Sequence, residues 1–197
     1  MSLRDVGEGR PVESSQVVHE GMIWDVVRDT VDLGDAGTVQ REYVRHPGAV
    51  AVIALDDEDR VLLLRQYRHP VRLELWEPPA GLLDVPGEDP REAAVRELAE
   101  EADLVADSWW RLVDFFTTPG GSDETVRIFL ARGLHPVPDA ERHVREAEEH
   151  GMVVRWVPLD EAVDAVLGGD VRNPSAVIGI LAAHASRGRG WRGLAEV

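Results

Sequence analysis

The sequence of 197 residues contains no cysteine and no long hydrophobic run. Without cysteine, disulfide bonds, thiolate zinc sites and cysteine nucleophiles are excluded. The longest mostly apolar stretches, residues 49–55 and 176–185, fall well short of the roughly 20 apolar residues that a membrane-spanning helix needs. The first 15 residues also lack the apolar segment of a secretory signal. We therefore expect a cytoplasmic protein with no membrane partner.

Positive charge is also scarce. Every basic side chain is an arginine, and 37 acidic residues against 21 basic ones leave a net charge of -16. This charge has the wrong sign for attraction to phosphate backbones, so nucleic acid is not an expected partner. The composition, 44% hydrophobic and 29% charged, is typical of a globular domain.

The N-terminal part of the chain predicts a small antiparallel β region. Residues 1–15 are polar and indicate a loose arm. Two strands, over 22–33 and 38–45, flank a turn at 34–37. Residues 49–55 and 61–67 indicate a buried hairpin around an acidic turn.

Residues 89–104 predict the clearest helix. Asp89 can cap it, Pro90 suits its first position, and Glu92 stands where a capping box has its glutamate. Further strands are expected over 110–117, 125–132 and 152–157, and helices over 160–167 and 174–186. This order favours an α/β fold in which helices cover a mixed sheet. We place a β region in residues 1–46 and the main domain in residues 47–197.

Three carboxylates lie on one face of the predicted helix. Glu97, Glu100 and Glu101 are spaced i, i+3 and i+4, so they repel one another unless solvent or a cation screens them. Carboxylate oxygens suit Mg²⁺ or Mn²⁺, whereas a solvated acidic face is the plain alternative. A proline-stiffened segment, 76–81, precedes the helix, and Gly81 could turn a carbonyl towards the same cation. Magnesium held by few protein ligands commonly shares its shell with phosphates, which suggests a phosphate-bearing substrate.

These residues resemble the Nudix hydrolase box, G-x5-E-x7-R-E-U-x-E-E-x-G-U. The matching positions are Gly81, Glu88, Arg96 to Leu98, Glu100, Glu101 and Leu104. Six residues instead of five separate Gly81 from Glu88, and Asp103 replaces the usual glycine. An aspartate can adopt the left-handed conformation that ends a helix.

The resemblance implies a set of roles for the matched positions. Glu97 and Glu101 would be the principal metal ligands, with Glu100 alongside, the Ala80 carbonyl as a further ligand and Glu88 near the outer shell. Arg96 would orient the glutamates through charge-assisted hydrogen bonds. Its plain alternative is a surface ion pair with Glu92 or Glu100.

Residues outside the box resemble the ADP-ribose pyrophosphatase branch of this family. The segment 66–68 includes Arg68, a candidate for the substrate's pyrophosphate, or else a solvent-exposed arginine at a strand end. The loop 119–124 includes Gly121, Ser122 and Glu124, which could contact a ribose, although a tight turn would need similar residues. Trp24 could stack on a purine, but tryptophans more often pack in cores or interfaces.

The resemblance also implies a general base in the acidic loop 146–149. Counted back from the strand that follows, Glu148 is the first candidate and Glu149 the second; a solvated charge run is the alternative. The implied reaction is divalent-metal-dependent hydrolysis of ADP-ribose to AMP and ribose 5-phosphate. The implied structure is an α/β/α sandwich over residues 47–197, in a homodimer joined through the N-terminal strands. One alternative is that the substrate is another nucleoside diphosphate sugar, such as ADP-glucose or GDP-mannose. The other is that the chain is a non-catalytic nucleotide-binding module.

Overall fold

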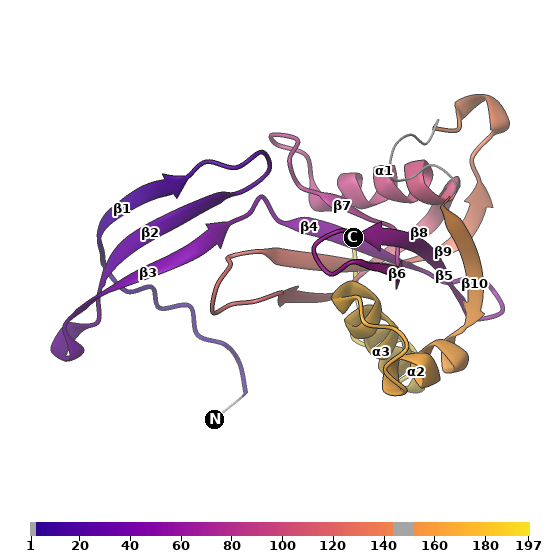
Figure 1. Cartoon of the computed structure of the whole chain (residues 1–197). Helices are drawn as coiled ribbons and strands as arrows, with labels where there is room; N and C mark the ends of the chain where they lie inside the picture. The colour runs from indigo at the N-terminus through magenta and orange to yellow at the C-terminus, as the bar shows by residue number, and fades with distance from the viewer. Residues whose placement is uncertain (1–2, 144–151) are drawn as a thin grey trace. The chain divides into compact units, whose positions relative to one another are not determined.

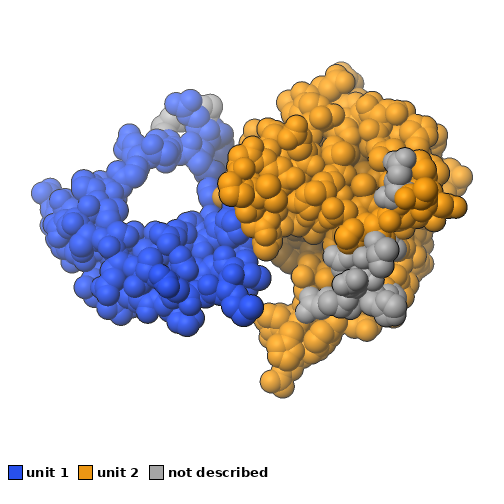
Figure 2. Space-filling view, turned by 90° about the horizontal axis from the view of Figure 1, so that it is seen from above, with its two compact units in different colours: residues 1–47, 116–124 blue, residues 48–115, 125–197 orange. Residues whose placement is uncertain are grey.

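The computed structural model of the chain describes residues 3–143 and 152–197. The chain packs into two compact units, coloured separately in Figure 2. Unit 1 comprises Met1–Pro47 with Phe116–Glu124, and unit 2 comprises Gly48–Phe115 with Thr125–Val197. The segment Phe116–Glu124 thus packs with the N-terminal strands, although it is far from them in sequence. The domain boundary after residue 46, and a dimerising role for residues 1–46, stay predictions.

Unit 1 is built on a three-stranded antiparallel sheet, in the order β1 (Val12–His19), β2 (Asp25–Asp32) and β3 (Thr38–Arg45). A short 3-10 turn, η1 (Gly34–Ala36), joins the last two strands, as the turn residues predict. The loose arm expected over residues 1–15 is wrong from Val12 onwards, because Val12 pairs with Val31 of β2. Strand β1 is exposed along its whole length, so it is held by backbone pairing and carries little hydrophobic signal.

Unit 2 contains a five-stranded sheet and a three-stranded sheet (Figure 1). The larger sheet is mixed, because β4 pairs with β9 in parallel and with β7 in antiparallel orientation. Its strands, in spatial order, are β11 (Ala195–Glu196), β8 (Leu104–Phe116), β9 (Thr125–Pro136), β4 (Ala49–Ala54) and β7 (Ala80–Leu82). The smaller sheet is antiparallel and consists of β10 (Val153–Pro158), β5 (Arg60–Arg68) and β6 (Leu73–Glu77).

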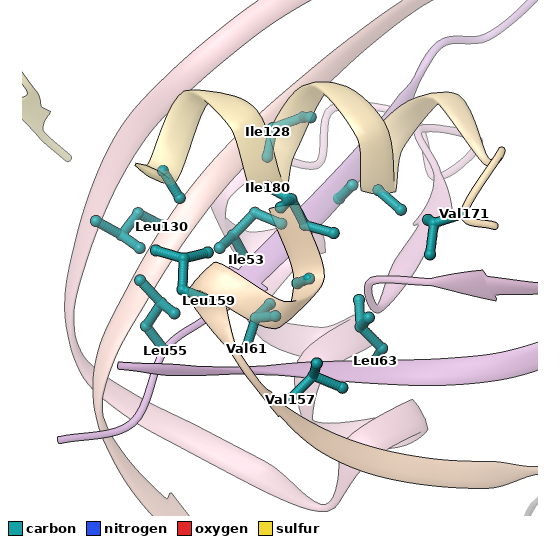
Figure 3. Close-up of a cluster of buried hydrophobic side chains, with 14 of the residues drawn as sticks. Ile53, Leu55, Val61, Leu63, Ile128, Leu130, Val157, Leu159, Val171 and Ile180 are labelled. Atoms are coloured by element: carbon teal, nitrogen blue, oxygen red, sulfur yellow. The ribbon is translucent and has the colours of Figure 1, made fainter. Parts of the chain in front are cut away.

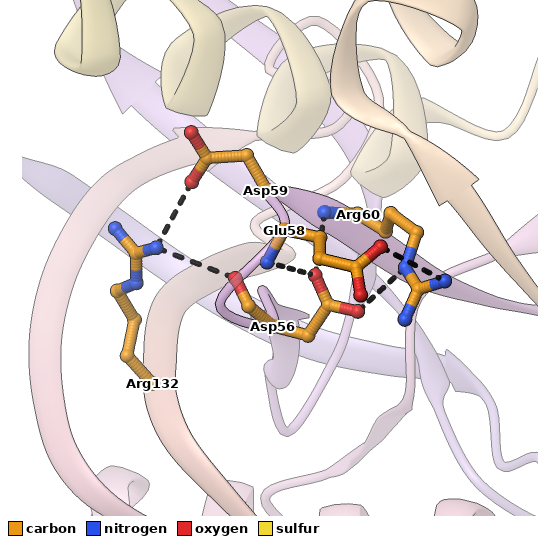
Figure 4. A network of polar contacts seen from close by, with 5 residues as sticks. All are labelled: Asp56, Glu58, Asp59, Arg60 and Arg132. Atoms are coloured by element: carbon orange, nitrogen blue, oxygen red, sulfur yellow. Dashed lines mark hydrogen bonds and ion pairs between the residues drawn. The ribbon is translucent and has the colours of Figure 1, made fainter.

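The expected hairpin of residues 49–55 and 61–67 is wrong, because β4 and β5 belong to different sheets. Only one isolated bridge, Leu55 to Val61, joins them beside the turn. Both edges of β4 are occupied by β9 and β7, so β5 pairs elsewhere. The turn itself is held by Asp56, whose carboxylate accepts hydrogen bonds from the backbone N–H groups of Glu58 and Arg60 (Figure 4).

Helices cover both faces of the larger sheet. Alternate residues of β4 point to opposite faces: Val50 and Val52 share a buried cluster with Leu98 of α1 (Pro90–Ala102). Ile53 packs in a second cluster with residues of α2 (Leu159–Leu167) and α3 (Pro174–Gly188) (Figure 3). The predicted mixed-sheet α/β/α sandwich is confirmed. A further 3-10 turn, η2 (Asp139–Glu141), lies outside these layers. No helix within the described ranges is long and apolar enough to cross a membrane.

Candidate active site

The acidic helix α1 begins and ends at residues that the sequence predicts. The Asp89 carboxylate caps it by accepting a 2.8 Å hydrogen bond from the Arg91 backbone N–H, and Pro90 occupies the first turn. The helix ends at Asp103, which adopts the left-handed conformation with φ 55° and ψ 36°. The aspartate that replaces the glycine of the motif therefore performs the same backbone role, as expected.

Strand β7 lies directly against two glutamates of this helix. The Ala80 backbone N–H donates a 2.8 Å hydrogen bond to Glu101 Oε2. Gly81 approaches Glu97 so closely that a Cβ on Gly81 would lie 1.9 Å from Glu97 Oε1. Gly81 pairs with Val50 in the sheet and is not among the residues with positive φ. The glycine is therefore needed for close approach, and the backbone turn inferred from the sequence is not its reason.

Burial argues against a solvated acidic face. Glu101 is only 7% exposed, and the Glu97 side chain is 13% exposed. Glu100 is more accessible, at 35%. A buried carboxylate is unfavourable unless hydrogen bonds or positive charge compensate it. The surroundings of these glutamates must therefore supply such hydrogen bonds or positive charge.

Arg96 supplies much of that positive charge. Its Nε and Nη2 donate to the two oxygens of Glu88 at 3.1 and 3.2 Å, and Nη1 donates to Glu97 at 2.6 Å and to Glu100 at 3.3 Å. The hydrogen bonds to Glu88 are the main cause that raises the pKa of Arg96, and they lower the pKa of Glu88. Arg96 thus contacts three of the candidate glutamates, a wider set than the surface pair with Glu92 or Glu100 considered above.

A tight turn absorbs the extra residue between Gly81 and Glu88. The Glu88 N–H donates to the Val85 carbonyl at 3.1 Å, and Gly87 between them has φ 82°. With Pro86 preceding it, Gly87 occupies the position of a type II turn that requires positive φ. Glu88 consequently still reaches Arg96 despite the longer spacing.

The donor set fits an open divalent-metal site. Within residues 3–143 and 152–197, no three acidic or histidine side chains converge closely enough to enclose a cation by themselves. Glu97 and Glu101 nevertheless meet the 80–81 backbone, and carboxylate and carbonyl oxygens are the ligands that Mg²⁺ and Mn²⁺ prefer. Magnesium commonly completes its shell with water and substrate phosphates, so few protein ligands suffice.

Arg68, at the end of β5, is held by a carboxylate to which sequence reasoning assigned no role. Its Nε lies 3.0 and 3.1 Å from the two oxygens of Glu77, and its Nη2 donates to Glu77 Oε2 at 2.6 Å. Glu77 is 3% exposed. A polar residue next to two prolines gives no periodic signal for such burial, so only the structure reveals it.

The remaining described candidates lie in unit 1. Val44 N–H donates to the Gly121 carbonyl at 2.9 Å, and Ser122 Oγ donates to the Val44 carbonyl at 3.2 Å, so the loop is fastened to β3. Glu124 accepts a 2.7 Å hydrogen bond from Thr117 Oγ1. The loop residues thus have the structural partners that a tight turn requires.

Trp24 stacks on a histidine that sequence reasoning missed. The rings of Trp24 and His46 are 5.8 Å apart at an interplanar angle of 28°, and His46 Nε2 lies 3.7 Å from Glu124. The candidates for general base, Glu148 and Glu149, lie outside the described residues.

The fold is an α/β/α sandwich, and helix α1 places Arg96 and its glutamates against Gly81 of strand β7. Together these features define a Nudix-type hydrolase. The NUDIX domain model matches residues 45–176. The chain is 48% identical over 172 residues to the ADP-ribose pyrophosphatase of Mycobacterium tuberculosis (strain ATCC 25618 / H37Rv), covering 87% of this chain and 82% of that protein. It is 34% identical over 173 residues to the methanol dehydrogenase activator of Bacillus methanolicus, covering 88% and 91% respectively.

A solved structure shares the fold. The crystal structure of an ADP compounds hydrolase superposes with a TM-score of 0.75 at 22% identity, covering 95% of this chain and 99% of that one. The chain therefore belongs to the NUDIX domain family, as the motif predicted. Nudix ADP-ribose pyrophosphatases depend on a divalent metal ion.

Proposed function

We propose that this chain hydrolyses the pyrophosphate bond of ADP-ribose to AMP and ribose 5-phosphate. The mycobacterial relative named for this activity is considerably more similar to the chain than the relative named as an activator. The observation that carries the proposal is that Glu97 lies directly against Gly81 and that Glu101 accepts a hydrogen bond from the Ala80 N–H. A non-catalytic module has no need for buried, mutually repelling carboxylates at this place.

Glu97 and Glu101 would hold Mg²⁺ or Mn²⁺, with Glu100 and the Ala80 carbonyl as further ligands. A bound divalent cation supplies positive charge to the two phosphates and lowers the pKa of a coordinated water. Arg96 keeps Glu97 and Glu100 in place through hydrogen bonds to both. Glu88, held by the same guanidinium, fixes Arg96 from the opposite side.

Other residues would handle the substrate and the proton. Glu148, or Glu149 in second place, accepts the proton of the attacking water. Arg68 binds the pyrophosphate with a guanidinium suited to phosphate oxygens. In unit 1, Trp24 stacks on the purine, and the loop residues Gly121, Ser122 and Glu124 contact a ribose. The active protein is a homodimer joined through its N-terminal strands.

The ligand role of Glu101 is tested by Glu101→Gln, which keeps the acceptor for the Ala80 N–H and removes the charge. We expect kcat/KM for ADP-ribose to fall by at least about 100-fold, because Lewis-acid assistance contributes several kcal/mol. Glu92→Gln, an exposed substitution on the same helix, is the matched control and should retain full activity. Unchanged turnover of Glu101→Gln would refute the ligand role.

The metal and the substrate are tested together on the purified chain. After treatment with EDTA, ADP-ribose hydrolysis should stop and should return on addition of Mg²⁺ or Mn²⁺, with the order of their rates identifying the better cation. Chromatography of the products should show AMP and ribose 5-phosphate. Faster turnover of ADP-glucose or GDP-mannose would assign that nucleoside diphosphate sugar as the substrate in place of ADP-ribose. Turnover by the EDTA-treated protein without any added metal would refute the mechanism.

The base assignment needs two matched variants. Glu148→Gln should reduce kcat strongly while KM changes little, because the charge is needed only when the proton is transferred. Glu149→Gln, the adjacent substitution of the same kind, should leave kcat close to normal. The reverse pattern would assign the base to Glu149.

A further inference from the structure

Glu77 is one of the two buried charged residues in the described part of the chain; the other is Glu101. A carboxylate this deeply buried is costly unless its charge and its lone pairs are satisfied. Glu77 ends strand β6, and its role is not explained by hydrophobic packing.

The Glu77 carboxylate accepts hydrogen bonds from two nitrogens of the Arg68 guanidinium. Both Nε and Nη2 of Arg68 donate to it, at distances from 2.6 to 3.1 Å. The Glu77 side chain is 4% exposed, whereas that of Arg68 is 42% exposed. Two-point hydrogen bonding fixes the plane of a guanidinium. The buried partner therefore determines where the exposed one points.

The chain continues from Glu77 directly into the backbone that meets the acidic helix. Pro78 and Pro79 have restricted φ angles, and the Pro79 carbonyl accepts a 2.8 Å hydrogen bond from the Val52 N–H in strand β4. The next two residues are Ala80, which donates to Glu101, and Gly81, which abuts Glu97.

We propose that Glu77 is a positioning residue, which through the rigid segment 77–81 sets the Arg68 guanidinium at a fixed place relative to the carboxylates of α1. The segment contacts Arg68 at one end, through Glu77, and the α1 glutamates at the other, through Ala80 and Gly81, so a displacement of one end is transmitted to the other. The inference rests on the proposed function, because it assigns Arg68 to the pyrophosphate of the substrate. Glu77 itself contacts no substrate.

The test compares Glu77→Gln with Glu74→Gln. Glu74 lies on the same strand and also faces an arginine of β5, with 3.2 Å between Arg65 Nε and Glu74 Oε2, but this pair is exposed. Steady-state kinetics with ADP-ribose at saturating Mg²⁺ should give a KM about tenfold higher for Glu77→Gln, with kcat within about threefold of wild type, the size expected when a charge-assisted hydrogen bond is weakened. Glu74→Gln should change neither value. An unchanged KM in folded Glu77→Gln would overturn the proposal.

A double-variant cycle separates positioning from general destabilisation. Arg68→Lys keeps a cation beside Glu77 but loses the two-point contact, so its KM should rise to a similar extent. Adding Glu77→Gln to Arg68→Lys should then raise KM no further, because both changes disable the same guanidinium. Multiplying KM effects would instead show that Glu77 acts independently of Arg68.

Stability and activity controls keep the outcomes apart. The Tm of each variant shows whether it folds; if Glu77→Gln does not, Arg68→Lys alone carries the test, and an unchanged KM there overturns the proposal. Wild-type protein without activity on ADP-ribose would reject the proposed function instead, before any variant is compared.

Discussion

Replacing Gly81 by alanine tests the contact between strand β7 and the acidic helix. The added Cβ would lie 1.9 Å from Glu97 Oε1, 2.1 Å from its Cδ and 2.6 Å from its Cγ. To reach ordinary van der Waals separation, the carboxylate must move by about 1.5 Å. The obstructing atoms belong to the end of a flexible side chain, so the side chain yields and the backbone does not.

The cost in stability should be small. Moving Glu97 breaks its 2.6 Å hydrogen bond with Arg96, and such a charge-assisted bond contributes about 1.5–3 kcal/mol. Alanine also lowers the conformational entropy of the unfolded chain, which stabilises the folded protein by about 0.4–1 kcal/mol. The net loss of about 0.5–2.6 kcal/mol should lower Tm by roughly 1–10 °C in a chain of this size.

The loss in activity should be much larger. Misplacing a group by about 1 Å can reduce the rate on the order of 100-fold, so kcat/KM for ADP-ribose should fall by about that factor. The assay is steady-state kinetics over a Mg²⁺ titration, with Tm measured on the same preparation. Gly188→Ala, where a Cβ would meet nothing within 4 Å, is the control and should remain active. A Gly81→Ala protein with wild-type kcat/KM and metal dependence would refute the reasoning.

Other substitutions probe stability apart from the site. Gly179→Ala would place a Cβ 2.6 Å from Ile53 Cδ1 in the core, so overpacking should cost about 1–3 kcal/mol; an unchanged denaturation midpoint would contradict this. Asp89→Ala removes the cap of α1 and should cost about 1 kcal/mol, measurable by urea unfolding. Burial alone would raise the pKa of Asp56, but hydrogen bonds from Arg60 and Glu58 outweigh it and lower the pKa below 3.8. Its stabilisation is therefore present above about pH 4 and is lost as the pH falls through the lowered pKa, so Asp56→Asn should be less stable than wild type at pH 7, and the difference should shrink in acid.

Local rules predicted the elements whose ends are marked by side chains. The pair Asp89 and Pro90 and the left-handed Asp103 define α1 with few alternatives. Asn173 and Pro174 likewise begin α3, where the Asn173 side chain accepts from the Ala176 N–H at 3.0 Å. In each case the deciding interaction lies within a few residues, so it can be inferred from the sequence.

Strand pairing could not be inferred in the same way. The largely buried runs that became β4 and β5 are adjacent in sequence, but each pairs with a distant segment, β4 with β9 and β5 with β10. A hydrophobic run indicates that a strand is buried, but it does not identify the strand with which it pairs. The same limit applies to Glu77 and His46, whose importance depends on contacts with residues that the sequence separates from them.

The balance of charge around α1 gives the physical reason for a metal in this mechanism. Arg96 bonds to Glu88, Glu97 and Glu100, and Glu101 lies one turn beyond Glu97. One guanidinium thus contacts three of four neighbouring carboxylates, within a chain whose net charge is -16. Because Arg96 is already shared among three of them, it has little charge to offer an anionic diphosphate, and Arg68 is partly neutralised by Glu77. The substrate can approach this face only with additional positive charge, which a divalent cation held by the glutamates would supply.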